Sequence, residues 1–316
     1  MKSRFSGRIA QGMMLCVFLV LLLVFSMKSM VYATEETVVE QTETSETTLN
    51  GWVTNARGKT FYYIDGVKVT GLKTIDSKTY YFKPSNGAMV TEKWVTLKKG
   101  KAWFNKNGVR VTGIKKINKK YYYFSAKGIL KTGTTKDGKN TYYADSKGVL
   151  YAWKIGSKYY KSNGKRMDSV DKKEFKTYLR AKSIAEDITT SKMSKAQKLK
   201  VCFNWVMSKN YAQMTDGINY PGWTADHAND HFLYGKGNCH ADACALAYLA
   251  KAIGYDEVYA CTDSTGTGAH GWCEINGLVY DPLFAQAKSY SAYYGVSYSS
   301  YYMSKPALHE KILSWL

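Results

Sequence analysis

Residues 51–167 contain a short aromatic motif that recurs six times. In each copy a pair of aromatic residues is followed within three to five residues by a glycine, and successive glycines lie 21, 21, 20, 20 and 16 residues apart. Strand-like runs on either side of Gly, Asn or Asp turn residues are typical of β-hairpins. One hairpin is marginally stable alone, so the copies must stack to bury their aromatic faces. The motif therefore predicts an N-terminal β-hairpin solenoid of tandem repeats. The pairs are Tyr62-Tyr63, Tyr81-Phe82, Trp103-Phe104, Tyr123-Phe124, Tyr142-Tyr143 and Tyr159-Tyr160, and the glycines are Gly66, Gly87, Gly108, Gly128, Gly148 and Gly164.

The positive charge of the chain resides in this repeat region. Residues 51–167 hold 26 Lys and Arg against 5 Asp and Glu, a balance of +21, whereas residues 168–316 hold 15 of each. A basic array favours polyanions, and outside a cell these include wall polymers with phosphate groups. Nucleic acid is the competing polyanion, but the export signal described next argues against it as a partner.

The first 33 residues have the pattern of a signal peptide. A basic start is followed by the 15 apolar residues 13–27 and by the small residues that a signal peptidase needs, ending at Ala33. Spanning a membrane takes about 20 apolar residues, and Lys28 ends the run earlier. We expect cleavage, secretion and no permanent membrane anchor. Residues 34–50 form an acidic Thr/Glu linker, too poor in apolar residues to bury a core.

The repeats resemble the cell-wall-binding, choline-binding and glucan-binding repeats of Gram-positive surface proteins. In choline-binding members, Trp and Tyr residues of successive hairpins form a cage around the trimethylammonium group. The resemblance implies wall attachment through teichoic acid, peptidoglycan or glucan. The chain ends at Leu316 without a sorting motif, so we expect this attachment to be non-covalent. The candidate ligand-binding residues are Trp52, Tyr62, Tyr63, Tyr81, Trp94, Trp103, Tyr123, Tyr142, Trp153 and Tyr159.

Two alternatives for these aromatic residues remain open. They could serve only as the core of the solenoid, because stacked hairpins need one. The Trp position of the motif is also replaced by Leu72, Ile114 and Thr134 in three units, so half of the cages would lack a wall. On this basis we expect choline to compete poorly for the repeats.

After residue 167 the pattern becomes helical and then strand-like. Apolar residues recur at helical spacing within 178–188 and 199–206, and Ser194 with Gln197 forms a capping box for the second helix. A third helix should begin after Asn238, a good N-cap, and run to Ile253 before Gly254. Strand-like runs follow at residues 257–261, 269–275 and 278–281.

Three residues of this region have the pattern of a thiol catalyst. Cys239 lies in the first turn of the predicted third helix, where the helix dipole and unpaired N–H groups stabilise a thiolate. His270 and Asp281 lie on two of the strands. A histidine next to the thiol exchanges its proton, and a carboxylate fixes the tautomer and orientation of the imidazole. This chemistry requires no cofactor.

The same segment resembles the transglutaminase-like superfamily. The resemblance covers roughly residues 190–285 and rests on Gly-Asn-Cys239 opening a helix, His270-Gly-Trp on a strand, and Asp281-Pro after the next. It implies an α+β, papain-like fold over residues 168–316, with Cys239 as nucleophile, His270 as base and Asp281 as the orienting residue. The implied activity is hydrolysis of amide bonds in a peptide or protein, as a peptidase or amidase. A cross-linking transglutaminase and a non-catalytic adhesin or scaffold are the alternatives. Trp223 and Tyr234 are candidate oxyanion donors beside the Cys239 backbone N–H.

The remaining cysteine and histidine residues have less specific patterns. Cys202 and Cys244 occupy apolar helical positions and are interpreted as core, whereas Cys261 and Cys273 could be core or a disulfide across neighbouring strands. His227 and His231 have the i, i+4 spacing of a zinc pair but lie in a polar stretch, so we interpret them as solvated loop residues and expect no metal. His240 should point away from the nucleophile.

Overall fold

A computed structural model describes residues 48–266 and 268–316. The predicted signal peptide (1–33) and residues 34–47 of the predicted linker lie outside the described residues. No helix among the described residues is long and apolar enough to cross a membrane.

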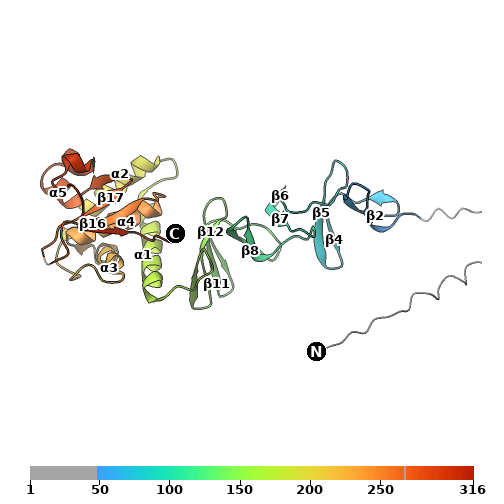
Figure 1. Ribbon diagram of the computed structural model, residues 1–316, viewed down its shortest axis with the longest axis horizontal. Helices are drawn as coiled ribbons and strands as arrows, with labels where there is room; N and C mark the ends of the chain where they lie inside the picture. The colour runs from blue at the N-terminus through green and yellow to red at the C-terminus, as the bar shows by residue number, and fades with distance from the viewer. Residues whose placement is uncertain (1–47, 267) are drawn as a thin grey trace, which may run out of the picture. The chain divides into compact units, whose positions relative to one another are not determined.

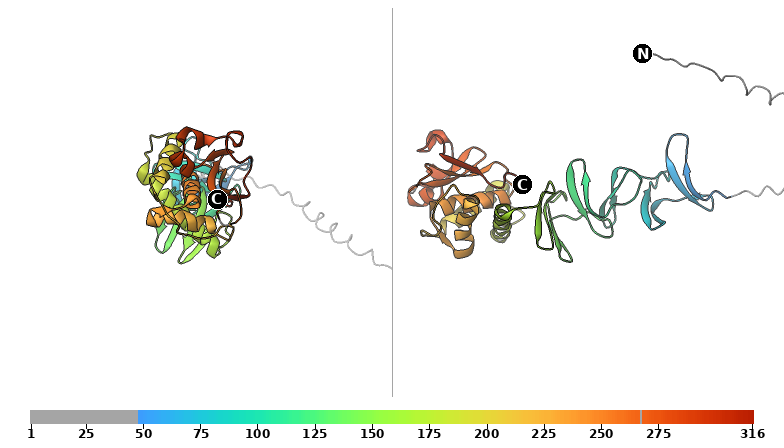
Figure 2. Two further views of the ribbon diagram at one scale, coloured as in Figure 1. Left: turned by 90° about the vertical axis from the view of Figure 1, so that its left-hand side faces the viewer. Right: turned by 60° about the horizontal axis from the view of Figure 1, so that its bottom comes forward.

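Within the described part of the repeat region, every copy of the motif forms one antiparallel β-hairpin, which confirms the prediction of one hairpin per repeat. The hairpins follow one another as separate ribbons in Figures 1 and 2. A short third strand, β3 (Val67–Lys68), extends the first hairpin. The pairs are β1 (Gly51–Thr54) with β2 (Thr60–Ile64), β4 (Gly71–Ile75) with β5 (Lys78–Phe82), β6 (Lys93–Leu97) with β7 (Gly100–Phe104), β8 (Gly113–Ile117) with β9 (Lys120–Phe124), β10 (Thr134–Asp137) with β11 (Asn140–Ala144), and β12 (Leu150–Ile155) with β13 (Lys158–Lys161).

The last two hairpins differ from the others because they join into a four-stranded sheet, β10-β11-β12-β13. After β5, β7 and β9 the chain makes only an isolated bridge before the next hairpin begins. After β11, by contrast, β12 begins at Leu150 and pairs directly with β11. The connection is shorter here than in the other units, so the following strand stays within reach of its predecessor.

Contacts between successive units centre on a glycine with positive φ. Gly148 has φ +85°, and a Cβ there would lie 2.8 Å from Leu130 of the preceding unit. Gly128 and Gly108 are approached in the same way by Arg110 and Met89. Glycine is required at these positions for two reasons: the backbone has a positive φ, and the neighbouring unit leaves no space for a Cβ atom.

Gly148→Ala is therefore expected to destabilise the array more than Gly133→Ala does. Gly133 also has positive φ (+65°), but no atom lies within 4 Å of the place that an added Cβ would take. Both changes carry the cost of a left-handed residue, about 1–2 kcal/mol. Only Gly148→Ala adds crowding against Leu130, about 1–3 kcal/mol more. Urea unfolding measures the free energy of unfolding of the two variants. Equal destabilisation by both substitutions would show that crowding against Leu130 adds no cost.

The C-terminal region is a mixed α/β domain. It begins with α1 (Ser169–Ile188) and α2 (Lys195–Met207), each opened by a capping box, the second formed by Ser194 and Gln197 as predicted. The predicted third helix is α4 (Cys239–Ala252), capped by Asn238 and ending before Gly254. The other elements are β14 (Asn210–Tyr211), α3 (Trp223–Asn229), the π-helix η1 (Asp230–Tyr234), β15 (Lys236–Gly237), β16 (Val258–Thr262), β17 (Gly271–Ile275), β18 (Leu278–Tyr280), α5 (Pro282–Ala287), α6 (Tyr290–Tyr293), β19 (Tyr294–Val296), η2 (Tyr298–Ser300) and β20 (Leu308–Lys311).

The domain is organised around α4 and an antiparallel sheet in the order β19-β18-β17-β16-β20. Almost every side chain of α4 is buried, since it packs between α1, α2, α3 and one face of the sheet. A smaller cluster that includes Trp272 and Tyr301 covers the other face. The start of α4 and the ends of the central strands therefore lie close together.

The four-stranded sheet of the last repeats shares a core with α1. Tyr143 contacts Phe175 with ring centroids 5.2 Å apart, and Ala152 and Met167 belong to the same buried cluster. Lys161 pairs with Asp171 at 2.6 Å. The hydrophobic core thus continues across the change from repeat to helical sequence.

The cysteine residues of the C-terminal domain are all buried. All five cysteines of the described residues are free. Cys202 and Cys244 are fully buried, as predicted for core residues. Cys261 and Cys273 lie on neighbouring strands but pair with Trp272 and Ala260, not with each other, and belong to clusters on opposite faces of the sheet. The alternative of a disulfide between Cys261 and Cys273 is therefore wrong, and both residues lie in buried clusters as core residues.

Candidate active site

Cys239 is the first residue of α4, as the sequence predicts. The Asn238 side chain accepts hydrogen bonds from the N–H groups of His240 and Ala241, each at 3.1 Å. Because this cap takes up the next two N–H groups, the helix begins sharply at Cys239. The thiol is 7% exposed and donates to the Ala269 carbonyl oxygen at 3.7 Å.

His270 lies directly before β17 and is oriented through three contacts. Its backbone N–H donates to Asp263 Oδ1 at 2.8 Å. Its Nε2 bonds to Asp281 Oδ2 at 2.7 Å, and its ring stacks on Phe284 with centroids 4.1 Å apart. With Nε2 committed to the carboxylate, Nδ1 is the ring nitrogen left for another partner.

Asp281 is fully buried and caps α5. Its Oδ1 accepts from the Phe284 N–H at 3.0 Å, and its Oδ2 accepts from Tyr301 Oη at 2.8 Å as well as from His270. The carboxylate is thus held on both oxygens, which fixes the imidazole plane. The structure brings together Cys239, His270 and Asp281, from elements that are distant in sequence.

This environment favours the imidazolium form of His270. Burial alone lowers the pKa of His270, but its hydrogen bonds to Asp281 and Cys239, together with their negative charge, outweigh that effect and raise the pKa to about 9.

The raised pKa of His270 leads to a pH prediction. In the thiol chemistry predicted from the sequence, a protonated His270 would donate to the leaving group, and the imidazolium form persists up to the raised pKa of about 9. We expect the acylation rate of Cys239 to fall about tenfold per pH unit above that value. Asp281→Asn removes the negative charge, so the alkaline limit should move to lower pH. Acylation rates measured between pH 6 and 11 test this, and an identical limit in both proteins would contradict it.

Cys239 and His270 open onto a cavity of ≈ 750 Å³. Its wall includes Tyr211, Gln213 and Asp216 from the segment between α2 and α3, and Leu283 of α5. Gln213 Oε1 also accepts from the Asn238 side chain at 3.0 Å, which ties this wall to the start of α4. The volume is suited to a peptide-sized or drug-sized ligand.

The predicted oxyanion donors do not line this cavity. Trp223 is buried against His227, and Tyr234 is largely exposed. Both residues shortly precede Cys239 in the sequence, but α3 and η1, which contain them, pack beside α4. Gln213 and Tyr301 were missed, because neither lies in a recognisable motif; the only signal for Gln213 was its position in a polar stretch preceding Cys239.

The prediction of solvated loop histidines is wrong. His227 and His231 lie in α3 and η1 and are buried. His227 Nε2 bonds to the Gly217 carbonyl oxygen at 2.7 Å, and His231 Nε2 to Asp242 at 2.6 Å. Each is held in the core by a polar partner, which the sequence pattern did not reveal. His240 is also buried, and it lines the cavity next to Cys239.

In the repeats, Trp52 and Trp94 each form a three-ring group with the nearest ring of their own hairpin and the nearest ring of the next; Phe82 and Phe124 lie slightly farther away, at 5.9 and 5.7 Å. Trp52 lies 5.0 Å from Tyr62 of its own hairpin and 4.8 Å from Tyr80 of the next, with near-perpendicular rings. Trp94 repeats the arrangement, 5.3 Å from Trp103 and 5.1 Å from Tyr122. Tyr80 and Tyr122 were not among the predicted ligand-binding residues. In both groups the residue that completes the group, Tyr80 or Tyr122, lies directly before the aromatic pair of the motif.

Other predicted ligand-binding residues lie in packing contacts. Tyr123 and Tyr142 are buried and stack on each other with centroids 3.5 Å apart. Trp153 is 5% exposed. Tyr81 packs against Phe104, Tyr159 against Phe175 of α1, and Tyr63 lies beneath Lys68. We assign the first three to the hydrophobic core, because buried rings offer no free face to a ligand.

Comparisons with known proteins concern the repeat region. A family model described as a choline-binding repeat matches residues 69–109, and one described as a putative cell wall binding repeat matches residues 114–130. Neither model reaches the α/β domain. A comparison with curated protein sequences returned no match.

Several solved structures align with about two fifths of the chain. A structure of CbpF in complex with ipratropium is 29% identical over 38% of this chain and 39% of its own, with a TM-score of 0.32. Choline binding protein F from Streptococcus pneumoniae in a second crystal form is 25% identical over 38% and 42%, with a TM-score of 0.32. The Cpl-1 endolysin with a peptidoglycan analogue is 24% identical over 39% and 38%, with a TM-score of 0.30. The chain spans less than half the length of each of these proteins. The family models show that the N-terminal half of the chain carries choline-binding cell-wall repeats.

Proposed function

We propose that this chain is a secreted thiol enzyme that its repeats hold non-covalently at a Gram-positive wall and that hydrolyses amide bonds of peptides or proteins. One observation carries the enzymatic part: Cys239 and His270 line one cavity large enough for a peptide segment, and the buried Asp281 bonds to His270. The arrangement has the three roles that thiol catalysis needs, in the order nucleophile, base and orienting carboxylate.

The reaction begins when the Cys239 thiolate attacks an amide carbonyl carbon. The N–H of Cys239 itself has no intrahelical acceptor at the first helical position, so it can stabilise the oxyanion of the tetrahedral intermediate. Imidazolium His270 donates its Nδ1 proton to the departing amine, and a thioester remains on Cys239. Neutral His270 then takes a proton from water, which attacks the thioester, releases the acid and restores the thiolate.

A primary amine can replace water in the second half-reaction, which would make the enzyme a transglutaminase. Incubation with a peptide mixture, with and without excess primary amine, separates the two by mass spectrometry. We expect hydrolysed products when water alone is present. Efficient amine incorporation with negligible hydrolysis would instead assign amine transfer. No turnover, with Cys239 alkylated no faster than Cys202, would favour a non-catalytic adhesin.

For wall attachment we propose choline of teichoic acids as the ligand. The two groups around Trp52 and Trp94 each present three rings from two neighbouring hairpins, which suits a trimethylammonium cation. The family description of residues 69–109 supports the same ligand. Choline was expected to compete poorly because three units lack a Trp at the motif position. The groups around Trp52 and Trp94 nevertheless contain three rings each, because the next hairpin contributes Tyr80 or Tyr122. The basic charge of the repeats adds attraction to phosphate-bearing polymers.

A further inference from the structure

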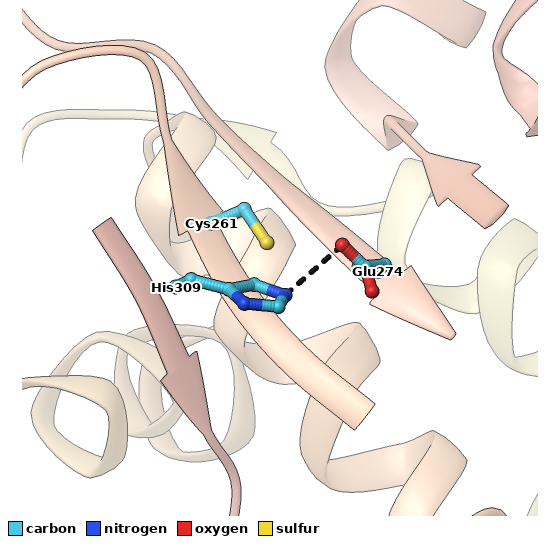
Figure 3. A group of neighbouring side chains, drawn as sticks. All are labelled: Cys261, Glu274 and His309. Atoms are coloured by element: carbon cyan, nitrogen blue, oxygen red, sulfur yellow. Dashed lines mark hydrogen bonds and ion pairs between the residues drawn. The ribbon is translucent and has the colours of Figure 1, made fainter. Parts of the chain in front are cut away.

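Three potential metal ligands meet on the face of the sheet opposite α4. Cys261 of β16 pairs directly with His309 of β20, and Glu274 of β17 pairs with Tyr259, two residues before Cys261. Residues directly paired or two apart on adjacent strands project to the same face. The antiparallel order β17-β16-β20 therefore brings together a thiol, a carboxylate and an imidazole that are far apart in the sequence (Figure 3).

The ligand atoms of this Cys261–Glu274–His309 cluster are close enough to share one ion. One ligand atom from each residue lies within 4.8 Å of the other two, and His309 Nε2 is 3.0 Å from Glu274 Oε2. In a tetrahedral zinc site with bonds of 2.0–2.3 Å, ligand atoms are about 3.3–3.8 Å apart. Side-chain movements of about 1 Å would bring the three ligand atoms to the spacing of a tetrahedral zinc site.

The cluster is buried at Cys261 and Glu274 and open to solvent at His309. Cys261 is fully buried and Glu274 is 8% exposed, whereas the His309 side chain is 41% exposed. An ion could enter past His309, and a fourth position would remain for water. None of the three residues lines the cavity of Cys239.

The side chains around the cluster hold it in place. Tyr298 Oη donates to Glu274 Oε2 at 2.8 Å and itself accepts from Trp272 Nε1 at 3.1 Å. The His309 ring stacks on Tyr259 with centroids 3.9 Å apart. Ligands of metal sites are held by such outer hydrogen bonds and packing.

We propose that Cys261, Glu274 and His309 form a zinc site that ties the C-terminal strand β20 to the centre of the sheet. The thiolate, imidazole and carboxylate set suits Zn²⁺ among divalent ions. Binding releases the thiol proton of Cys261, whose sulfur electron pair forms the new bond, while His309 binds as neutral imidazole. Ion pairing alone would account for Glu274 and His309 but leaves the thiol between them without a strong partner, since its contact from Tyr298 is 4.0 Å long.

Cobalt titration of the full chain tests the site. The Cys239→Ala background removes the active-site thiol, so any thiolate-to-cobalt charge-transfer absorption must come from another cysteine. After reduction and chelator treatment, we expect one equivalent of Co²⁺ to produce this band and Zn²⁺ to abolish it by competition. Cys261→Ser should remove the band, and Cys202→Ala, a buried thiol outside the cluster, should retain it.

His309→Gln serves as the second variant, because its exposed position should leave folding intact. It should weaken cobalt binding at least about tenfold and remove the rise in melting temperature that Zn²⁺ causes in the parent protein. A band that persists in Cys261→Ser would overturn the proposal. So would the absence of binding to the folded parent, or an equal zinc-induced shift in His309→Gln.

Discussion

Cys239→Ala is expected to lower amide turnover by about 10⁴-fold or more, because it removes the atom that forms the acyl intermediate. The side chain lies at a cavity wall, and alanine suits the first turn of α4, so the fold should persist. Turnover of a cleaved peptide and trapping of a thioester by mass spectrometry measure the effect. The variant should show neither.

Cys244→Ala is the matched control for this experiment. Cys244 lies five residues further along the same helix, fully buried, where burial raises the pKa of its thiol well above the usual value. It should keep its activity while losing some stability, since the smaller side chain leaves a gap in the core. If Cys244→Ala and Cys239→Ala lose activity equally, the loss reflects packing and not nucleophilic attack.

The double variant Trp52→Ala/Trp94→Ala is expected to weaken binding to isolated choline-containing walls by about 10²-fold or more. Each substitution removes the shared wall of a three-ring group, and a cation–π site contributes about 1–2 kcal/mol. Sedimentation with walls gives the affinity, and soluble choline should release the parent protein.

Leu72→Ala provides the control, because Leu72 occupies the Trp position of the intervening unit and is 45% exposed. It should bind walls like the parent. Raising salt to 1 M shortens the Debye length to about 3 Å, which screens the basic charge but not the ring contacts. Complete release by salt alone would assign attachment to charge and contradict the role of the rings.

The elements with strong local signals were predictable from the sequence. The hairpins have aromatic runs bounded by turn residues, and the start of α4 has the cap at Asn238. Cys239, His270 and Asp281 could be expected to meet because a cysteine that opens a helix is followed by a histidine and an aspartate on strand-like runs, the pattern of a thiol catalyst. The hairpins and the start of α4 depend on neighbours in the chain, which is what sequence patterns record.

Features created by tertiary contacts could not be predicted. Tyr301 reaches Asp281 from beyond β19, and Tyr80 completes a ring group with a tryptophan in the preceding unit. His227 and His231 looked polar and therefore exposed, but buried partners satisfy both. In each case the partner lies on another element, and no local pattern specifies it.

The glycine contacts between repeats have a consequence for how such an array changes over generations. Three successive units touch the previous one at this kind of position, through Gly108, Gly128 and Gly148. Insertion or loss of a whole unit by unequal recombination would keep a glycine at this position of each junction, whereas the side chain that it meets differs between units (Met89, Arg110 and Leu130). A shift of a few codons would place a bulkier residue against the neighbouring unit. The number of units can therefore change in the middle of the array more easily than next to α1, where the four-stranded sheet joins the last two hairpins to the core of the C-terminal domain.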